Sequence, residues 1–329
     1  MINKLEEIGF YSLSDERVKN TSLTSQMKRC EMILLEQCNF KCPYCRGLKP
    51  EIYGNRKHKM LSLEEIKQNI DYWCENEPLE NIRFSGGEPT LHPDIKEIVK
   101  YSKEKGIKRI AISTNGSNKL ELYKELINLG VNDYSISLDA CCAEDGDKMS
   151  GGVKGSWNIV TENIKEISKL TYISVGVVLN ELNIDKTIDT VIFADSLGVS
   201  DIRIISAAQY NQPIPRLNEI PESIKEKYPI LRYRIDHFAN GINVRGIKDT
   251  DSNKCHLMLD DSVIAGSWVF NCVIHMREGG KPICKVGSNM RKERYDFIQT
   301  FDTHKDPICK KNCLDVCIEY NNKYKFYHE

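Results

Sequence analysis

The sequence predicts an α/β fold in which six strand–helix repeats form an open, partial (β/α)6 barrel of TIM-like type, followed by a small cysteine-rich C-terminal domain. Short β-rich runs alternate with amphipathic helical segments up to about residue 208, and six of the thirteen cysteines lie after residue 254. Alternating strands and helices are typical of a parallel sheet with right-handed crossovers. Six repeats are too few to close an eight-stranded barrel, so we expect the barrel to be open.

The expected strands are apolar, as parallel strands are when helices cover both faces of their sheet. They are Met32–Glu36, Asn81–Ser85, Lys108–Ser113, Tyr134–Leu138, Tyr172–Leu179 and Asp201–Ser206. Helix signals lie between them, because Ser62 and Glu65 have the form of a capping box while Gly130 and Gly198 are placed to end two helices. Ligands in such folds collect at the carboxyl ends of the strands, so polar residues there are the first candidates for a site.

Four segments are expected along the chain: an N-terminal extension (1–29), the partial barrel (30–208), a connecting segment (209–254) and the cysteine-rich domain (255–329). Several prolines interrupt the pattern in the connecting segment, and a helix is expected around Ile230–Asn240. In the last segment the run Ser262–Phe270 predicts a short hairpin, which would bring Cys272 near Cys255.

Composition and charge exclude several classes of protein. The 46 lysines and arginines nearly balance the 47 acidic residues, so no overall field attracts nucleic acid or an anionic membrane. No apolar run approaches the roughly 18–20 residues needed to span a bilayer, and the N-terminus lacks the apolar core of a signal peptide. We therefore expect a cytoplasmic protein without a membrane partner. An odd number of cysteines in such a protein favours reduced, metal-binding thiols over disulfides.

The first candidate metal site follows the first expected strand. Cys38, Cys42 and Cys45 have the spacing C-x3-C-x2-C. Three thiolates on one loop can ligate three irons of a [4Fe–4S] cluster, which leaves the fourth iron open for a chelating ligand. The alternative is a structural zinc ion, which needs a fourth Cys or His nearby, and His58 is the nearest candidate in the sequence.

Polar motifs follow the other expected strands. They are Gly86, Gly87, Glu88 and Pro89 after the second strand, Ser113–Gly116 after the third, Ser137 and Asp139 at the fourth, Asn180 after the fifth and Arg203 on the sixth. Paired glycines let the backbone approach a ligand closely, and a glutamate can accept a hydrogen bond from an ammonium group. The Ser137 hydroxyl and the Asp139 carboxylate suit the ribose or the amino-acid end of a nucleoside ligand. Each alone is an ordinary turn or surface residue, but together they predict a polar pocket around the cysteine loop.

The cysteine motif after strand one, with Gly86-Gly87-Glu88-Pro89 after strand two, resembles the radical S-adenosylmethionine (SAM) superfamily over roughly residues 30–206. The resemblance implies that SAM chelates the open iron and that its amino group meets Gly86–Pro89. It also implies that Ser137 lies near the SAM carboxylate or ribose, that Tyr44 lies near the adenine, and that Asn180 and Arg203 contribute. The Gly-x-Ile-x-Gly pattern frequent on strand five in this family is not clear in Val175–Glu181.

The resemblance further implies the reaction. In this family one electron from the reduced cluster cleaves SAM to methionine and a 5′-deoxyadenosyl radical, which abstracts a hydrogen atom from a substrate. The electron would come from a donor such as flavodoxin or ferredoxin. The tasks left to the chain are to aim the radical at one hydrogen and to exclude water.

The tail predicts a second metal site. Its candidate ligands are Cys255, Cys272, Cys309, Cys313 and Cys317. Four thiolates fully ligate either a second [4Fe–4S] cluster or a structural zinc ion. The tail resembles the SPASM/Twitch extension of radical SAM enzymes, and the single-cluster Twitch form fits better because the SPASM form needs more cysteines. The resemblance implies one auxiliary [4Fe–4S] cluster, and we expect four ligands from this set with Cys309 as the substitute.

Cys141 and Cys142 follow Asp139 closely and are candidate hydrogen-atom donors to a substrate radical, which would make the enzyme an epimerase. The alternative is that they are two small, partly buried residues with a packing role.

The tailed subgroup of the family is rich in peptide maturases, so the resemblance implies an oxidoreductase or maturase that modifies a peptide. The 29 leading residues are too few for an added peptide-recognition domain, which keeps open a small metabolite such as an aminosugar or nucleoside. RNA modification is the third alternative. The balanced net charge argues against it, although Arg291, Lys292 and Arg294 form a small basic cluster in the sequence.

Overall fold

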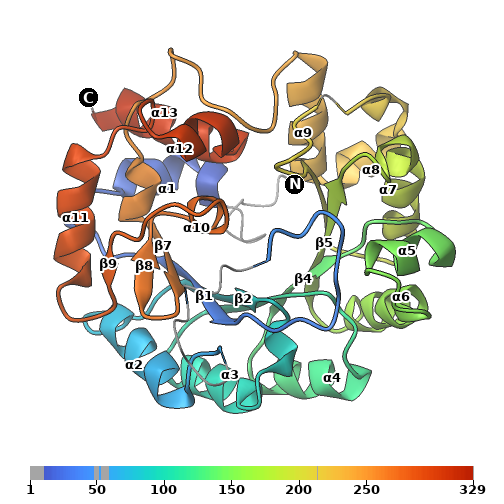
Figure 1. Cartoon of the computed structure of the whole chain (residues 1–329), viewed down its shortest axis with the longest axis horizontal. Coiled ribbons are helices and arrows are strands. Elements are labelled where there is room, and N and C mark those ends of the chain that lie inside the picture. The colour runs from blue at the N-terminus through green and yellow to red at the C-terminus, as the bar shows by residue number, and fades with distance from the viewer. Residues whose placement is uncertain (1–10, 48–51, 53–58, 213, 329) are drawn as a thin grey trace. The chain divides into compact units, whose positions relative to one another are not determined.

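A computed structural model describes residues 11–47, 52, 59–212 and 214–328 (Figure 1). The chain forms two compact units, of which the first comprises Met1–Gln37, Arg46–Ile110 and Arg245–Glu329 and the second Cys38–Cys45 and Ala111–Val244. Neither unit coincides with one of the four segments expected from the sequence, so that functional division stays a prediction. The first and last parts of the chain belong to the same unit.

The sheet of the first unit joins segments that are far apart in the sequence. Strands β1 (Arg29–Leu35) and β2 (Asn81–Gly86) pair in parallel, and β1 also pairs in parallel with β7 (Asp261–Ala265). β7 turns at Gly266, at φ 57°, into the antiparallel strand β8 (Trp268–Phe270), which pairs with the short β9 (Cys284–Lys285). The expected hairpin is thus confirmed, but its parallel pairing with β1 was not foreseen, since the tail was expected to be a separate domain.

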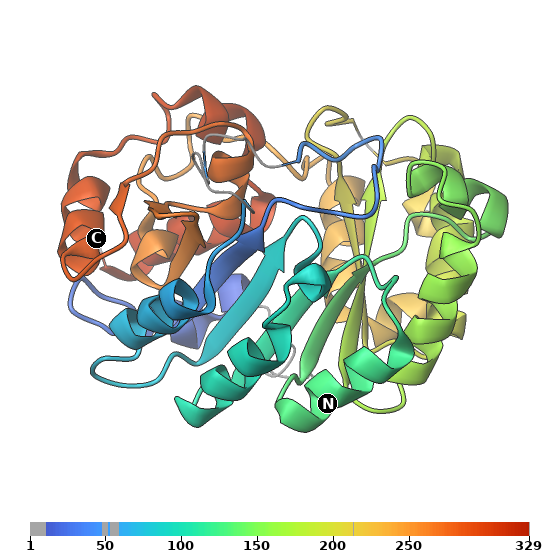
Figure 2. The same cartoon turned by 60° about the horizontal axis from the view of Figure 1, so that its bottom comes forward.

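Helices of the first unit follow local sequence signals. They are α1 (Asp15–Asn20), α2 (Leu63–Trp73), α3 (Ile95–Glu104), α10 (Val273–Arg277), α11 (Met290–Thr300), α12 (Pro307–Asn312) and α13 (Asp315–His328), with the short 3-10 helices Tyr11–Leu13, Pro89–Leu91 and His256–Leu259. The capping box is confirmed, because Ser62 Oγ accepts a hydrogen bond from Glu65 N at 3.3 Å while Glu65 Oε2 accepts one from Ser62 N at 2.9 Å. Figure 2 shows α2 and α3 on the same face of β1 and β2.

A separate hydrophobic core ties the N-terminal segment to the tail. Val18 of α1 packs in one buried cluster with Leu259, with Ile298 of α11 and with Tyr320 of α13. The segment was expected only as an N-terminal extension, and Val18 places it in the core on which the tail helices pack. Burial of such side chains typically stabilises a fold by about 1.5–3 kcal/mol each.

The second unit contains the remaining parallel strands. β3 (Arg109–Thr114) enters it through Ala111 and pairs with β4 (Asp133–Ser137), which pairs with β5 (Tyr172–Leu179), which pairs with β6 (Asp201–Ser206). Its helices are α4 (Leu120–Leu129), α5 (Ala143–Met149), α6 (Ser156–Ile167), α7 (Thr187–Ser196), α8 (Glu222–Lys227) and α9 (Pro229–Ala239), with 3-10 turns at Ile184–Lys186 and Leu217–Glu219. Figure 1 shows these helices outside the strands.

The predicted fold class is confirmed. All six expected strands are present, the helix expected around Ile230–Asn240 is α9, and Gly130 follows α4 directly with φ 131°. The sheet is mostly parallel and is not closed into a barrel. All thirteen cysteines lie among the described residues, and none of them forms a disulfide. Within the described ranges, no helix has both the length and the apolar character needed to cross a membrane.

Candidate functional site

The loop Cys38–Cys45 brings three thiols together without regular secondary structure. Cys38 and Cys45 are exposed and Cys42 is half-buried. Phe40 N donates a hydrogen bond to Cys38 Sγ at 3.4 Å, and Cys45 N donates one to Cys42 O at 3.0 Å. Burial, together with the negative charges of Asp139 and of the other two thiolates, raises the pKa of Cys42 to about 12. The thiols are therefore close enough to affect one another electrostatically, as ligands of one metal centre must be.

Asparagine side chains fix the first half of this loop. Asn115, which follows β3, donates from Nδ2 to Asn39 Oδ1 at 2.8 Å, and Asn39 donates from Nδ2 to Ser117 Oγ at 2.8 Å. Ser117 in turn donates to Asn115 Oδ1 at 2.7 Å. Asn115 Nδ2 also lies 3.9 Å from Cys38 Sγ. The sequence singled out Asn115 only as part of a polar motif, and it gave no sign that Asn39 would be its partner.

Main-chain contacts fix the second half. Lys41 N donates to Ser150 O at 2.9 Å, and Gln209 Nε2 donates to Tyr44 O at 3.0 Å. The chain approaches so closely that a Cβ on Gly151, which has φ 88°, would lie 2.6 Å from Lys41 O. Glycine is required there both by the backbone conformation and by the lack of space.

The hydroxyl of Tyr44 is bound by Asp139 at the carboxyl end of β4. Tyr44 Oη donates to Asp139 Oδ2 at 2.5 Å, and Val178 N donates to Asp139 Oδ1 at 2.7 Å. Burial raises the pKa of Asp139 to about 6, against the opposing effect of these two hydrogen bonds, and burial also raises the pKa of Tyr44. Both carboxylate oxygens are thus occupied by the chain itself. Asp139, expected to contact a nucleoside, instead anchors the aromatic residue of the cysteine loop.

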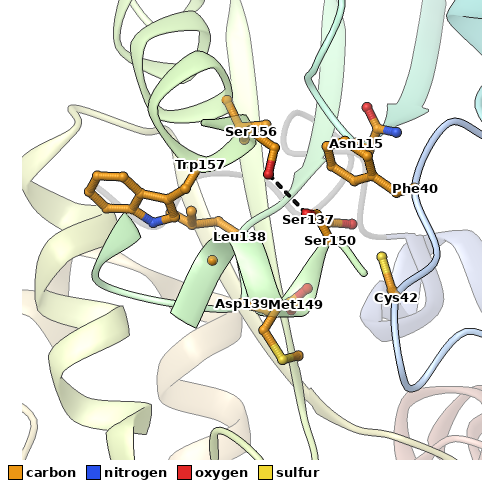
Figure 3. A pocket seen from close by; sticks show the side chains of 12 residues that line it. Phe40, Cys42, Asn115, Ser137, Leu138, Asp139, Met149, Ser150, Ser156 and Trp157 are labelled. Carbon is orange, nitrogen blue, oxygen red and sulfur yellow. Dashed lines mark hydrogen bonds between the residues drawn. The ribbon is translucent and has the colours of Figure 1, made fainter. Parts of the chain in front are cut away.

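A cavity of about 70 Å³ opens beside Cys42 (Figure 3). Its lining consists of Phe40, Cys42, Asn115, Ser137, Leu138, Asp139, Gly146, Met149, Ser150, Ser156, Trp157 and Val160. Ser137, the last residue of β4, is exposed, and its place near SAM stays a prediction. An apolar cavity of about 150 Å³ accommodates benzene, so this one is large enough only for part of a ligand.

Asp147 of α5 fixes the far wall of this cavity. Its carboxylate accepts hydrogen bonds from Gly155 N at 2.6 Å, from Trp157 N at 3.0 Å and from Ser156 Oγ at 3.1 Å. These backbone donors, that of Trp157 first, lower the pKa of Asp147. Trp157 Nε1 donates to Ala140 O at 2.9 Å, which fixes its ring. Sequence reasoning missed Asp147 and Trp157, since an acidic residue eight positions before a glycine belongs to no motif.

In the first unit, Gly86 and Gly87 press against the end of β1. A Cβ on Gly86 would lie 2.5 Å from Leu35 O, and one on Gly87 would lie 2.2 Å from Gln37 O. Gly87 N donates to Leu35 O at 2.8 Å, and Glu88 N donates to Gln37 O at 2.8 Å. The paired glycines therefore let this loop bind the segment that directly precedes Cys38 in the sequence.

Glu88 serves its own loop. Its side chain caps the short helix Pro89–Leu91, because Glu88 Oε1 accepts hydrogen bonds from Thr90 N at 3.0 Å and from Thr90 Oγ1 at 2.6 Å. Glu88 is only 1% exposed. The acceptor expected for an ammonium group is therefore a structural cap in this structure, and the main chain of the loop is the better candidate for ligand contact.

Two residues expected near SAM have other partners in the second unit. Asn180 Oδ1 accepts a hydrogen bond from Leu182 N at 2.9 Å, so Asn180 closes the turn after β5. Arg203 Nε donates to Asp201 Oδ2 at 2.8 Å, and its Nη2 lies 3.4 Å from Tyr172 Oη. Because Asp201 and Tyr172 begin β6 and β5, the guanidinium is directed away from the carboxyl ends of the strands. We therefore omit Arg203 from the site.

Cys141 and Cys142 lie outside the lining of the cavity in Figure 3. Both are half-buried, and Cys142, the residue before α5, donates from Sγ to Asp145 Oδ2 at 3.3 Å. Asp145 also forms an ion pair with Lys186. This geometry gives no support to a role as hydrogen-atom donors and agrees with the packing alternative.

The tail cysteines lie close together in the first unit. Cys255 precedes the helix His256–Leu259, Cys272 caps α10, Cys309 and Cys313 lie in and after α12, and Cys317 lies in α13. Burial raises the pKa of Cys255 to about 11 and, with the charge of the Cys255 thiolate, that of Cys272 to about 12. Burial, followed by the charges of the other tail thiolates, also raises the pKa values of Cys313 and Cys317 well above their ordinary range. Thiolates in such surroundings need a cation, so the donor set suits a metal centre.

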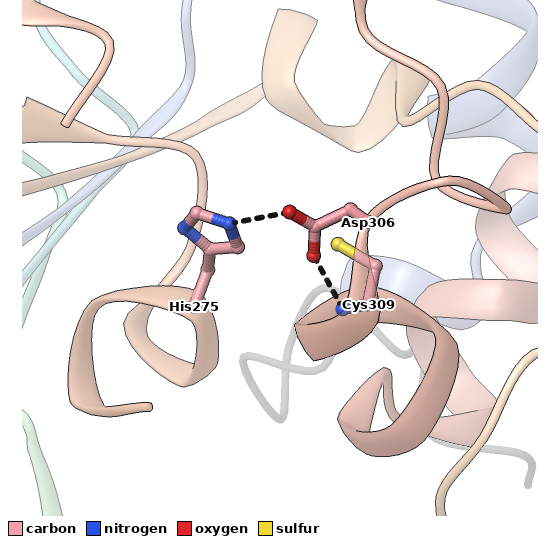
Figure 4. Close-up of side chains that lie close together, drawn as sticks. All are labelled: His275, Asp306 and Cys309. Carbon is pink, nitrogen blue, oxygen red and sulfur yellow. Dashed lines mark hydrogen bonds and ion pairs between the residues drawn. The ribbon is translucent and has the colours of Figure 1, made fainter. Parts of the chain in front are cut away.

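Cys309 lies beside an acidic residue and a histidine. Asp306 Oδ1 accepts a hydrogen bond from Cys309 N at 2.7 Å, and Asp306 Oδ2 lies 3.3 Å from His275 Nε2 (Figure 4). Donor atoms of His275, Asp306 and Cys309 all lie within 4.8 Å of one another. The sequence gave no sign that His275 and Asp306 would lie beside Cys309.

The basic cluster Arg291, Lys292 and Arg294, which favoured an RNA substrate, does not form an exposed basic patch. Arg294 is fully buried and its Nη2 donates to the carbonyls of Met258 and Asp261. Arg291 donates to Trp73 O at 2.8 Å, and both guanidinium groups lie over the Trp73 ring. These arginines pack α11 against α2, so the basis for an RNA-binding patch was wrong.

His58, the expected fourth ligand of the zinc alternative at the first site, lies outside the described residues.

Comparison with known proteins bears on both units. A family model described as the radical SAM superfamily matches residues 32–194. The chain is 31% identical over 184 residues to a GTP 3′,8-cyclase of Aquifex aeolicus, a match that covers 54% of this chain and 56% of the cyclase. It is 32% identical over 220 residues to a putative glycyl-radical enzyme activating enzyme of Methanocaldococcus jannaschii, covering 61% of this chain and 86% of that protein. The chain thus spans little more than half the length of the cyclase.

Solved structures resemble more of the chain at lower identity. SuiB of Streptococcus suis bound to S-adenosylmethionine has a TM-score of 0.57 at 14% identity, covering 86% of this chain and 65% of SuiB. The protein anSMEcpe with bound AdoMet also has a TM-score of 0.57 at 14% identity, covering 92% of this chain and 97% of that chain. These likenesses concern the fold alone, and they agree with a partial TIM-like barrel. The family match and the Methanocaldococcus relative establish that the chain is a member of the radical SAM superfamily.

Proposed function

We propose that this protein binds SAM at a [4Fe–4S] cluster ligated by Cys38, Cys42 and Cys45, and that it abstracts a hydrogen atom from a substrate. The observation that carries the proposal is the loop Cys38–Cys45, whose three thiols interact electrostatically and of which Cys38 and Cys45 are exposed, while the rest of the loop is fixed by hydrogen bonds.

The donor set fits such a cluster. Three thiols match three irons, and N–H donors to a ligating sulfur, such as Phe40 N at 3.4 Å from Cys38 Sγ, are typical of iron–sulfur sites. When bound, the reduced cluster and SAM supply one electron and the 5′-deoxyadenosyl radical that removes the hydrogen atom. The electron donor would be a protein such as flavodoxin or ferredoxin.

The chain's own residues then bind, orient and exclude water. We assign the main chain of Gly86–Pro89 to the SAM amino group and the exposed Ser137 hydroxyl to the SAM carboxylate or ribose. Tyr44, anchored by Asp139, keeps the cysteine loop in one conformation. Trp157 forms part of an apolar wall that keeps water from the cavity beside Cys42.

The tail would hold one auxiliary [4Fe–4S] cluster, as the resemblance to Twitch extensions implies. We assign its ligands as Cys255, Cys272, Cys313 and Cys317, because these four repel one another as thiolates in a buried place. Cys309, whose thiolate is also repelled by Cys255 and Cys272, is kept as the substitute because Asp306 and His275 are its immediate neighbours. A zinc ion in the tail is the alternative that iron counting tests.

For the substrate we propose a peptide, so that the protein would be an oxidoreductase or maturase of peptides. SuiB was solved bound to the precursor peptide SuiA, and its fold resembles 88% of this chain with a TM-score of 0.55. A small molecule is the second candidate, because the relative of 31% identity is named a GTP 3′,8-cyclase. Because Arg294 is buried, the basic cluster no longer supports RNA as the substrate.

The experiment that tests the reaction is anaerobic reconstitution followed by reduction in the presence of SAM. We expect about eight irons and eight sulfides per chain and the formation of 5′-deoxyadenosine and methionine. Iron near four per chain with one zinc would assign zinc to the tail. Absence of 5′-deoxyadenosine from a protein with full iron content would contradict the proposed function.

The substrate class is tested by exchange of hydrogen. Candidate peptides, nucleotides and aminosugars carrying deuterium are incubated with the reduced enzyme and SAM, and deuterium in 5′-deoxyadenosine is measured by mass spectrometry. Transfer from a peptide supports the first candidate, and transfer from a nucleotide or aminosugar replaces it with the second.

A further inference from the structure

Helix α10 contacts the tail cysteine Cys272 at one end and Gly86, of the loop Gly86–Pro89, at the other. Cys272 precedes it and accepts a hydrogen bond at Sγ from His275 N at 3.3 Å. Its last residue, Arg277, donates from Nη2 to Gly86 O at 3.1 Å. The next residue, Glu278, forms an ion pair with Arg46, which directly follows Cys45 in the sequence. The residues that make these contacts, from Cys272 to Glu278 together with Arg46 and Gly86, belong to the first unit.

The contacts at the carboxyl end of α10 are partly shielded from water. The Arg46 and Glu278 side chains are 24% and 21% exposed, and Gly86 is buried. Charge-assisted hydrogen bonds in such places are stronger than those between exposed groups. Arg277 therefore limits the movement of the Gly86 carbonyl, and Glu278 limits the movement of Arg46.

The position of α10 depends in turn on the tail. A helix of five residues is not stable by itself, so its place is set by what its residues contact. His275 Nε2 lies 3.3 Å from Asp306 Oδ2, before α12. On the other side of the ring the chain is so close that a Cβ on Gly280 would lie 2.0 Å from His275 Nδ1. Cys272 and His275 thus fix the start and the middle of α10. The position of the helix then determines where Arg277 holds Gly86 and where Glu278 holds Arg46.

We propose that Arg277 and Glu278 are positioning residues for SAM binding, and that α10 couples occupancy of the tail metal site to the SAM-binding loop Gly86–Pro89. The inference rests on the proposed function, in which that loop contacts SAM and Cys272 is a tail ligand. A metal at Cys272 fixes the start of α10, and Arg277 passes this restraint to Gly86. Without the restraint, SAM must order the loop on binding and is bound more weakly.

The test is the dissociation constant of SAM, measured anaerobically by equilibrium dialysis with labelled SAM on reconstituted protein. Arg277→Gln is expected to weaken binding about tenfold, the loss of one charge-assisted hydrogen bond, with unchanged iron content. Arg277→Lys, which keeps a charged donor, is expected to recover part of the affinity. Arg291→Gln is the matched control, because Arg291 also donates to a main-chain carbonyl, that of Trp73, and its removal leaves the affinity unchanged.

The coupling itself is tested by combining variants. Cys272→Ala is expected to weaken SAM binding, and the double variant Cys272→Ala/Arg277→Gln to bind as the weaker single variant does, because both changes interrupt one path. In Arg277→Gln at saturating SAM, the SAM-dependent change in the electron paramagnetic resonance signal should remain. Wild-type affinity in Arg277→Gln, tighter binding, or effects that multiply in the double variant would overturn the proposal. If the wild-type protein cleaves SAM, these results overturn only the coupling through α10 and leave the proposed function intact.

Discussion

The cysteines of the loop and those of the tail lie in opposite surroundings. Cys38 and Cys45 are exposed on a loop without regular structure, whereas Cys272 and Cys317 are half-buried beside helices and Cys309 is buried. The loop keeps its shape through side-chain hydrogen bonds, such as that between Tyr44 and Asp139. The tail has more thiols than one tetrahedral or cubane site requires. Exposure suits a metal centre that binds a ligand, and burial suits one that is fully ligated by protein.

Replacing the loop cysteines should have the largest effect. In the triple variant Cys38→Ala/Cys42→Ala/Cys45→Ala, cleavage of SAM is expected to fall to background because no open iron remains. Iron should fall from about eight to about four per chain, the content of the tail alone. Iron and sulfide analysis with chromatography of 5′-deoxyadenosine measures both, and an unchanged iron content would show that the loop holds no cluster.

The second largest effect is expected in the tail and concerns stability. Cys313→Ala should lower the melting temperature of the reconstituted protein by roughly 5–10 °C, since a buried metal contributes directly to folding. Cys309→Ala is the matched control and should shift it by only a few degrees, because Cys309 is assigned to packing beside Asp306. Thermal unfolding under anaerobic conditions gives the comparison. Equal shifts would mean that Cys309 is a ligand.

A smaller effect separates the two sites kinetically. Tyr44→Phe removes the donor to Asp139 Oδ2 and leaves a buried oxygen unpaired, which costs about 1–3 kcal/mol. The loop should then release its iron to a chelator roughly tenfold faster, while release from the tail keeps its rate. The course of chelation followed by absorbance shows two phases, and an unaltered fast phase would remove Asp139 from its positioning role.

The smallest effect concerns acid stability of the second unit. Hydrogen bonds from Trp157 N and Gly155 N lower the pKa of Asp147 below that of the unfolded chain. The carboxylate therefore stabilises the fold at pH values above about 4, and this contribution is lost as the pH falls through the lowered pKa. Asp147→Asn should be slightly less stable than wild type at pH 7 and should lose less on acidification. Urea unfolding of the metal-free proteins at both pH values measures the difference, and parallel losses would contradict it.

Local sequence patterns predicted the six strands well, and the cysteine motif could be read directly from the sequence. Apolar runs such as Tyr172–Leu179 and the glycine pair at Gly86 are readable because a few neighbouring residues determine them. The pairing of β7 with β1 was not readable, since it joins residues more than 200 positions apart and leaves no local sign.

The interaction partners of side chains were harder to predict than the positions of the residues in the fold. Asp139 was expected at the carboxyl end of β4 and lies there, but its partner Tyr44 comes from the cysteine loop. Arg294 was counted in a small basic cluster, and only the fold reveals the Trp73 ring beneath it. Glu88 was assigned to a ligand and caps its own turn. In each case the type of residue was informative while its partner depended on tertiary structure.

The most direct test of the difference between loop and tail is a Mössbauer spectrum of the 57Fe-reconstituted protein, recorded with and without SAM. We expect about one iron in eight to change its isomer shift on SAM addition, because only the loop cluster lacks a fourth protein ligand. The triple variant that lacks Cys38, Cys42 and Cys45 should show no change. A spectrum that is insensitive to SAM in the wild type, or a change that persists in the triple variant, would contradict the account.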